Sequence, residues 1–362
     1  MKWSLNLGKI AGIDVKIHIT FLLIIGWVAM AHWQRGQTLA AAAAGVVFIL
    51  ALFACVVAHE FGHALTARKY GIKTRDITLL PIGGVARLER MPDNPREELW
   101  VALAGPAVNL VLAAGLFLWL IATATLVPFG QLTVASGAFA ERLLVANIFL
   151  AVFNMLPAFP MDGGRVVRAL LAMRMNYARA TQVAANIGQG MAFVFGFIGL
   201  FYNPFLVFIA LFVWIGASQE ASMAQLKASL GGIPVSHAMI TNFQTVAPTD
   251  RISRAVELIL AGSQRDFPVT DDTGIIGILE RDRILAALAQ GGLDTLVAEE
   301  MARDFQSADA QEMLDAAFLR LQTCGCHTMP VLRGKRLAGL LTAENVGEFI
   351  MIQSALQGRG SR

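Results

Sequence analysis

The chain has 362 residues, of which 56% are hydrophobic and only 15% are charged. This balance excludes a protein that is soluble throughout, because several uncharged runs reach the roughly 20 residues that a helix needs to cross a bilayer. The net charge is only +3 and the basic residues form no clustered face, which argues against a nucleic-acid partner. We therefore expect a membrane protein in contact with the lipid bilayer.

Long apolar stretches in the first two thirds of the chain are candidates for membrane-spanning helices. One is long enough to cross and then turn at Pro128 and Gly130, and another is split by Tyr202-Asn203-Pro204, which favours a helical hairpin. We therefore expect about six transmembrane helices. The N-terminus lacks the features of a removed signal peptide, so the first span is expected to stay. The candidate stretches are Ile17–Gln34, Gly36–Ala58, Leu99–Ala140, Leu143–Met161 and Ala180–Gln219.

The positive charges fall on one side of these spans. Lys and Arg residues gather before the first span, between the second and third, and between the fourth and fifth, whereas the opposite loops hold only Arg35 and Arg142. Lys and Arg are enriched in cytoplasmic loops. We therefore expect a multi-pass protein of the cell (inner) membrane whose two termini are both cytoplasmic.

The second span ends in His59-Glu60-Phe61-Gly62-His63. Histidines four residues apart project from one face of a helix, so both imidazoles can reach one metal ion. Glu60 lies beside the first histidine, where it can take a proton from a water molecule at the metal. Ionisable groups at membrane depth are costly and usually functional. The alternative is a helix end whose polar residues reach cytoplasmic water.

A catalytic zinc ion needs a third protein ligand and an open position for water. The best candidate is Asp162, in Asn154-Met-Leu-Pro157-Ala-Phe-Pro160-Met-Asp162-Gly163-Gly164. Prolines and glycines break the helix there, and broken backbone at membrane depth is tolerated only where it is buried in protein or lines a cavity. The alternative interpretation is that Asp162 only caps the following helix.

These two motifs resemble those of the site-2 protease family of membrane-embedded zinc metalloproteases. Its members carry the two histidines and the glutamate on one transmembrane helix and the aspartate in an Asn-x-x-Pro…Asp-Gly segment on another. The resemblance covers residues 1 to about 225. It implies that His59, His63 and Asp162 bind one Zn²⁺ per chain and that Glu60 is the general base and acid.

Two more segments resemble this family, Leu80-Pro-Ile-Gly83-Gly84-Val85-Ala86 and Gly105-Pro106-Ala-Val-Asn109. The resemblance implies that Asn154 and Asn109 orient the substrate or stabilise the oxyanion, although an Asn in a span often only joins helices. Gly84 and Val85 are expected to bind substrate in an edge strand, which would pair the backbone of an unwound substrate. The alternative is a simple turn between two strands.

The tail differs from the rest of the chain. Residues 1–228 carry a net charge of +7 and residues 229–362 a net charge of −4, without a spanning run. When the tail is shifted along itself so that Met239 falls on Met301, it aligns without gaps, and Pro268 then falls on Pro330. This repeat resembles a pair of cystathionine-β-synthase-type (CBS) modules. We expect a transmembrane metalloprotease domain at 1–228 and CBS modules at 229–293 and 294–356.

Pairs of CBS modules often bind adenine nucleotides in the cleft between them, through a Gly-x-x-Ser/Thr-x-x-Asp pattern. The two copies here read Gly277-Ile-Leu-Glu280-Arg-Asp282 and Gly339-Leu-Leu-Thr342-Ala-Glu344, and each departs from that pattern. The resemblance implies a candidate nucleotide site at Asp282, Thr342 and Glu344. A module for homodimerisation or docking is the alternative.

The predicted fold is an α-helical polytopic membrane protein with about six transmembrane helices and a small membrane-associated β segment, plus a cytoplasmic α+β tandem CBS pair. The predicted activity is zinc-dependent hydrolysis of a peptide bond in or near the transmembrane segment of a substrate protein, as in regulated intramembrane proteolysis. One alternative is a CBS-gated metal or ion transporter, which would usually spread its ligands over internal repeats. Another is an inactive membrane scaffold, which would be expected to lose a catalytic residue.

Overall fold

A computed structural model describes residues 3–81, 83–92, 94–125, 133, 137–290 and 292–359 of the chain. The chain forms two compact units, Met1–Ala224 and Gln225–Arg362, and each is described by itself. The expected turn at Pro128 and Gly130 lies outside the described residues.

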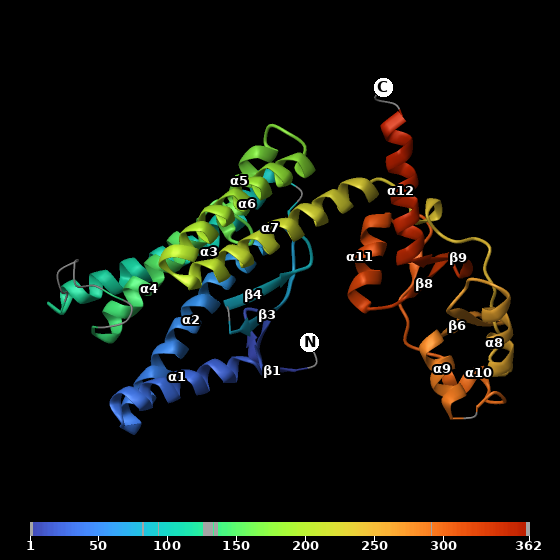
Figure 1. The fold of residues 1–362 in the computed structure, drawn as a ribbon, viewed down its shortest axis with the longest axis horizontal. Coiled ribbons are helices and arrows are strands. Elements are labelled where there is room, and N and C mark those ends of the chain that lie inside the picture. Colours follow the sequence, from blue (N-terminus) through green and yellow to red (C-terminus); the bar gives the residue numbers. More distant parts are fainter. Residues whose placement is uncertain are drawn as a thin grey trace. The chain divides into compact units, whose positions relative to one another are not determined.

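The first unit is built on helices (Figure 1). Its last helix, α7 (Pro204–Leu230), extends past the end of this unit. The side chains of Thr38, Asn94 and Asn176 accept hydrogen bonds from backbone N–H groups at the starts of α2, α3 and α6. The helices are α1 (Phe21–Gly36), α2 (Leu39–Lys69), α3 (Pro95–Ala122), α4 (Phe139–Asn154), α5 (Asp162–Ala172), α6 (Tyr177–Tyr202) and α7 (Pro204–Leu230).

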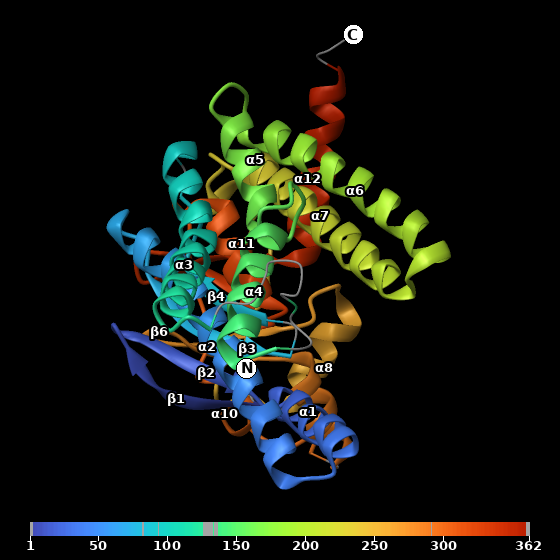
Figure 2. The same ribbon diagram turned by 90° about the vertical axis from the view of Figure 1, so that its left-hand side faces the viewer.

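Four of these helices, α2, α3, α6 and α7, are long and apolar enough to cross a membrane. The expected hairpin is present, since α6 and α7 run side by side (Figures 1 and 2) and Gln189 donates a hydrogen bond to the Ser218 hydroxyl at 3.0 Å. The helices α1 and α4 have 16 residues each. At 1.5 Å per residue they reach about 24 Å, less than the roughly 30 Å of a hydrocarbon core. The count of six spans therefore stays a prediction.

A four-stranded sheet packs against α2. The strands β1 (Ser4–Ile10), β2 (Ile13–His18), β3 (Thr74–Leu80) and β4 (Gly83–Leu88) lie in the order β1-β2-β3-β4. Ile13 and Ile77 pack on Ala64 of α2. The sequence predicts only β3 and β4, with Ile17 and His18 in a span, whereas both residues belong to β2. The strands β1 and β4 are the two edges of this sheet.

Charged side chains tie the strands β2, β3 and β4 together. Asp76 on β3 accepts hydrogen bonds from Lys16 on β2 at 2.9 Å and from the Arg87 Nε on β4 at 2.7 Å. Burial alone would raise the pKa of Asp76, but the bonds from Arg87 and Lys16 lower this pKa to about 2. The carboxylate therefore stays ionised near neutral pH and fixes β4 against the rest of the sheet.

The second unit contains the two expected modules. Its secondary structure repeats with the same spacing as its sequence. The parallel β-bridge between Val246 and Val269 in the first copy corresponds to the pairing of Ala308 with Val331 in the second. After a short turn of 3₁₀-helix (Val235–His237), the elements are α8 (Ile252–Ala261), β5 (Phe267–Asp271), β6 (Gly274–Leu279), α9 (Arg281–Ala289), α10 (Val297–Glu300), β7 (Ala308–Asp309), α11 (Leu314–Cys324), β8 (Thr328–Arg333), β9 (Arg336–Thr342) and α12 (Ala343–Arg359).

The two modules exchange their leading segments. Ile240 of the first repeat pairs with Leu340 of the second, and Ala302 of the second pairs with Ile278 of the first. The shift that places Met239 on Met301 also places Ile240 on Ala302 and Ile278 on Leu340. The two bridges therefore correspond to each other, as expected for a pseudo-twofold pair. The leading segment of each sequence repeat therefore pairs with the strands of the other repeat.

Candidate active site

Three buried side chains from distant parts of the chain bring one ligand atom each to a common point. The Nε2 atoms of His59 and His63 are 3.1 Å apart, and each lies 3.1 Å from the Oδ2 atom of Asp162. These residues are 4–6% exposed. Among the described residues, they form a group of His, Cys, Asp and Glu side chains that can hold a metal ion.

The local sequence explains how this cluster is built. His59 and His63 are one turn apart on α2, which continues to Lys69 rather than ending at the motif. Asp162 is the first residue of α5, while Met161 occupies the cap position, so Asp162 is not the expected N-cap. At Gly163 a Cβ atom would lie 2.2 Å from the Leu156 carbonyl oxygen, so the tight loop before α5 needs glycine there.

The outer nitrogens of both histidines meet oxygen atoms. The Nδ1 of His63 lies 2.6 Å from the backbone carbonyl of Val101, which can only accept a hydrogen bond. The Nδ1 of His59 lies 2.5 Å from the Oδ1 of Asn109. With the proton on Nδ1, each neutral ring directs an Nε2 lone pair at the shared point, where the carboxylate of Asp162 adds a third. Three converging lone pairs fit a cation.

The dimensions of the cluster suit zinc. Ligands about 2.0–2.1 Å from a tetrahedral zinc ion lie roughly 3.3 Å from one another, close to the 3.1 Å separations observed. Gly105 of α3 provides the space, because a Cβ atom there would lie 2.2 Å from the His63 Nε2 and 2.6 Å from the His59 Nε2. Three protein ligands leave a fourth position for water, as in catalytic zinc sites.

Glu60 lies between the metal cluster and the edge of the sheet. Its Oε2 accepts a hydrogen bond from the backbone N–H of Ala86 at 3.1 Å. At Gly84 a Cβ atom would lie 2.8 Å from the Cγ of Glu60, so glycine allows β4 to approach α2 this closely. The strand therefore orients the carboxylate beside the two histidines.

The other predicted residues of the membrane unit occupy different surroundings. Asn109 is fully buried behind His59, where it orients the imidazole instead of facing open space. Asn154 ends α4, is half-buried, and makes no side-chain hydrogen bond to the described residues. Val85 is 45% exposed on the outer strand β4. Asn147, which no sequence motif indicates, accepts a hydrogen bond from Asn109 at 2.9 Å.

A buried ion-pair cluster that no sequence motif indicates fixes the helix that carries Asp162. The Nε of Arg168 on α5 donates to Glu98 on α3 at 2.8 Å, and its Nη1 donates to Glu220 on α7. Its guanidinium lies 5.0 Å from the ring centres of Phe159 and Tyr177. Arg168 and Glu98 are each 1% exposed. The cluster therefore ties α5 to α3, whose residues contact both histidines.

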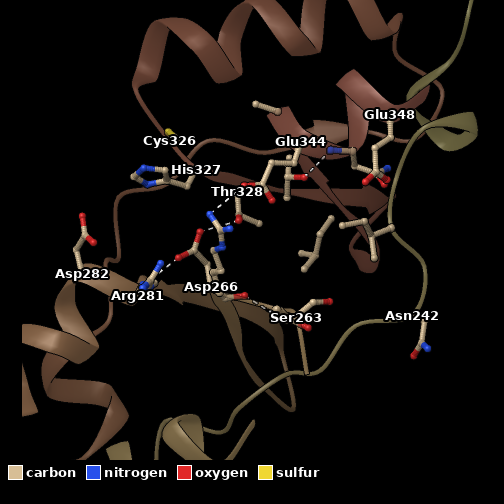
Figure 3. Close-up of a pocket in the computed structure, with 17 residues that line it drawn as sticks. Asn242, Ser263, Asp266, Arg281, Asp282, Cys326, His327, Thr328, Glu344 and Glu348 are labelled. Carbon is tan, nitrogen blue, oxygen red and sulfur yellow. Dashed lines mark hydrogen bonds and ion pairs between the residues drawn. The ribbon is translucent and has the colours of Figure 1, made fainter. Parts of the chain in front are cut away.

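The second unit contains a cleft of about 580 Å³ that brings together the three candidate nucleotide residues, Asp282, Thr342 and Glu344. Asp282 and Glu344 lie on opposite sides of it (Figure 3). Glu344 pairs with Arg265 at 2.9 Å, and the Thr342 hydroxyl accepts a hydrogen bond from the Asn345 N–H at 3.1 Å. Asp282 makes no hydrogen bond or ion pair with the described residues.

The chain is similar in sequence to known families and proteins. The model of peptidase family M50 matches residues 47–141 and 131–198, and the model of the CBS domain matches residues 235–290. The zinc metalloprotease MJ0392 of Methanocaldococcus jannaschii is 34% identical over 280 residues, which are 77% of this chain and 78% of that protein. The protein Rip3 of Mycobacterium tuberculosis is 30% identical over 99% of this chain and 95% of its own length.

A solved structure is also similar. The site-2 protease from Methanocaldococcus jannaschii is 37% identical, with a TM-score of 0.45, over 60% of this chain and 95% of that one. The sequence matches alone cover the metal motif and extend through most of the chain. The chain therefore belongs to peptidase family M50, the site-2 protease family of zinc metalloproteases.

Proposed function

We propose that this metalloprotease hydrolyses a peptide bond in or near the transmembrane segment of a membrane protein. The observation that carries the proposal is the position of the metal cluster, since His59, Glu60 and His63 lie on α2, a helix long and apolar enough to cross a membrane. A multi-pass inner-membrane protein with cytoplasmic termini fits the distribution of Lys and Arg in the sequence.

The proposed mechanism assigns one task to each group. His59, His63 and Asp162 hold the metal ion, and a zinc ion bound there supplies Lewis-acid chemistry, polarising the scissile carbonyl and acidifying water. Glu60, oriented by the N–H of Ala86, takes a proton from the attacking water and gives it to the leaving amine. Asn154 makes no hydrogen bond to the described side chains, and we assign to it the binding of the substrate backbone.

A comparison of membrane proteomes from cells with the native enzyme and cells with the Glu60→Gln variant tests this function. We expect a truncated membrane protein in the native cells and its full-length precursor in the variant cells. The cleavage site should lie in or next to a hydrophobic segment of the precursor. Identical proteomes, with both enzymes expressed and folded, would contradict the proposal.

We further propose that the outer edge of β4 pairs with the unwound substrate. A substrate drawn out of its helix has unpaired backbone groups, which are costly to leave unsatisfied near lipid, and an edge strand can satisfy them. Because the N–H of Ala86 points out of the sheet toward Glu60, the alternation of an antiparallel pair directs the N–H of Val85 toward β3. A Val85→Pro variant would therefore disrupt the sheet itself.

Disulfide cross-linking is the sharper test of this edge. With the substrate known, a Val85→Cys enzyme should cross-link to substrate cysteines placed two residues apart and miss the positions between them, because side chains alternate along a strand. The matched control is Leu5→Cys on β1, the opposite edge, where the native side chain is 61% exposed. Equal cross-linking at successive substrate positions, or at Leu5→Cys, would contradict pairing at β4.

For the CBS modules we propose regulation through an adenine nucleotide bound in their cleft. The support is that Asp282, Thr342 and Glu344 line one cleft and that Asp282 is free to bind a ribose. Calorimetry on the full chain should show ATP or AMP binding that Asp282→Asn weakens about tenfold or more, as expected when a charged hydrogen bond is lost. Thr342→Ser, which keeps the hydroxyl, is the control. Absence of binding at millimolar nucleotide would favour a homodimerisation module.

A further inference from the structure

A continuous chain of buried amide side chains leads from α4 to the metal cluster. Asn147 on α4 donates from Nδ2 to the backbone carbonyl of Leu143 at 2.8 Å, and this nitrogen also lies 3.4 Å from the sulfur of Cys55. The Oδ1 of Asn147 accepts from the Nδ2 of Asn109 at 2.9 Å. The Oδ1 of Asn109 in turn faces the Nδ1 of His59 at 2.5 Å. Both asparagines are 0% exposed.

The backbone of α4 sets the direction of every bond in this chain. The carbonyl of Leu143 can only accept, so the side-chain amide of Asn147 must turn its NH₂ group toward that carbonyl. The oxygen of Asn147 then faces Asn109, which must turn its own NH₂ group toward it. This leaves the Asn109 oxygen against His59, so the imidazole carries its proton on Nδ1 and an electron pair on Nε2.

We infer that Asn147 is a positioning residue for the metal site, because it holds Asn109 in the orientation that gives His59 the tautomer able to bind a cation. The inference deepens the proposed function and rests on the same zinc site. Without an acceptor at residue 147, Asn109 can rotate by half a turn and present its NH₂ group to His59. The favoured tautomer then carries its proton on Nε2, and the ring no longer offers a lone pair to the metal.

His63 does not share this dependence. Its Nδ1 meets the carbonyl of Val101 directly, and a backbone carbonyl cannot turn over. The tautomer of one histidine is therefore fixed by the backbone, while the other is fixed through two side chains. Partners of this kind, one step beyond the ligands, typically contribute 10–100-fold to metal affinity.

A double-mutant cycle on zinc affinity tests the inference. The dissociation constant for zinc is measured by chelator competition on the purified full chain and on Asn109→Ala, Asn147→Ala and the double variant. We expect each single variant to bind zinc about 10–100-fold more weakly. The double variant should be no weaker than Asn109→Ala alone, because Asn147 acts only through Asn109.

Two further variants separate positioning from a purely structural role. Asn147→Asp keeps an acceptor for Asn109, so it should preserve zinc affinity even where burial of an acid lowers thermal stability. Thr181→Ala is the matched control, since Thr181 is fully buried on α6 and donates to the carbonyl four residues earlier at 2.9 Å, and makes no hydrogen bond to His59, His63, Asp162 or Asn109 among the described residues. It should leave zinc affinity unchanged.

Three results would overturn the inference. The first is native zinc affinity in Asn147→Ala. The second is a double variant whose loss of zinc affinity equals the product of the losses in the two single variants. The third is a loss of zinc affinity in Asn147→Asp as large as that in Asn147→Ala. A native chain that binds no zinc would instead remove the proposed function itself. The two failures are therefore distinguishable in the same set of measurements.

Discussion

Replacing Glu60 with glutamine is expected to lower the cleavage rate about 10²–10⁴-fold, the usual contribution of a general acid–base group, while zinc stays bound. Glutamine has the same shape, and its amide oxygen can still accept the hydrogen bond from the Ala86 N–H. It cannot take a proton from water. Cleavage of the identified substrate and zinc content are measured on the same purified sample.

The control for this variant is Glu97→Gln, on the first turn of α3 and outside the metal cluster. It should cleave at the native rate. Loss of zinc in Glu60→Gln would show that Glu60 belongs to the ligand set, and a native cleavage rate would show that proton transfer uses another group. Either result would contradict the role assigned to Glu60.

Replacing Arg168 with methionine is expected to destabilise the first unit by about 3–5 kcal/mol, the usual cost of leaving one partner of a buried ion pair alone. Methionine fills much of the space but leaves Glu98, which is 1% exposed, without its cation. It also releases α5 from Glu220 on α7. The measurement is reversible unfolding of the purified protein in detergent.

The double variant Arg168→Met with Glu98→Gln is the control for this effect. Removing both charges of a buried pair costs much less than removing one, so the double variant should recover most of the lost stability. A single variant as stable as the native protein would show that the cluster of Arg168, Glu98 and Glu220 does not hold the helices together.

The ligands of the metal site could be predicted because their chemistry is local in the sequence. His59, Glu60 and His63 occupy one helical turn, and Asp162 is marked by the prolines and glycines around it. Asn109 could be predicted as a site residue from the motif Gly105-Pro106-Ala-Val-Asn109. Its contact with His59 could not, because that contact depends on how α2 and α3 pack. Asn147 and Arg168 carry no local signal, because an Asn in a span or an Arg on a short helix usually has an ordinary packing role.

The fold shows the same division. The long apolar helices follow from hydropathy, and the repeat of the tail follows from aligning the tail with itself. The sequence does not predict β1 and β2 although Ile13, Val15 and Ile17 alternate with polar residues, because lysines before a span also indicate membrane orientation. The exchange of leading segments between the modules, at Ile240 and Ala302, is a tertiary arrangement that no local pattern encodes.

X-ray absorption at the zinc edge of the purified native chain measures which atoms bind the metal ion. We expect one zinc ion per chain with two imidazole nitrogens and oxygen ligands at about 2.0–2.1 Å, and no sulfur at about 2.3 Å. His63→Ala should remove one imidazole from this spectrum. A chain without zinc, or a zinc ion with sulfur ligands, would contradict the assignment of His59, His63 and Asp162.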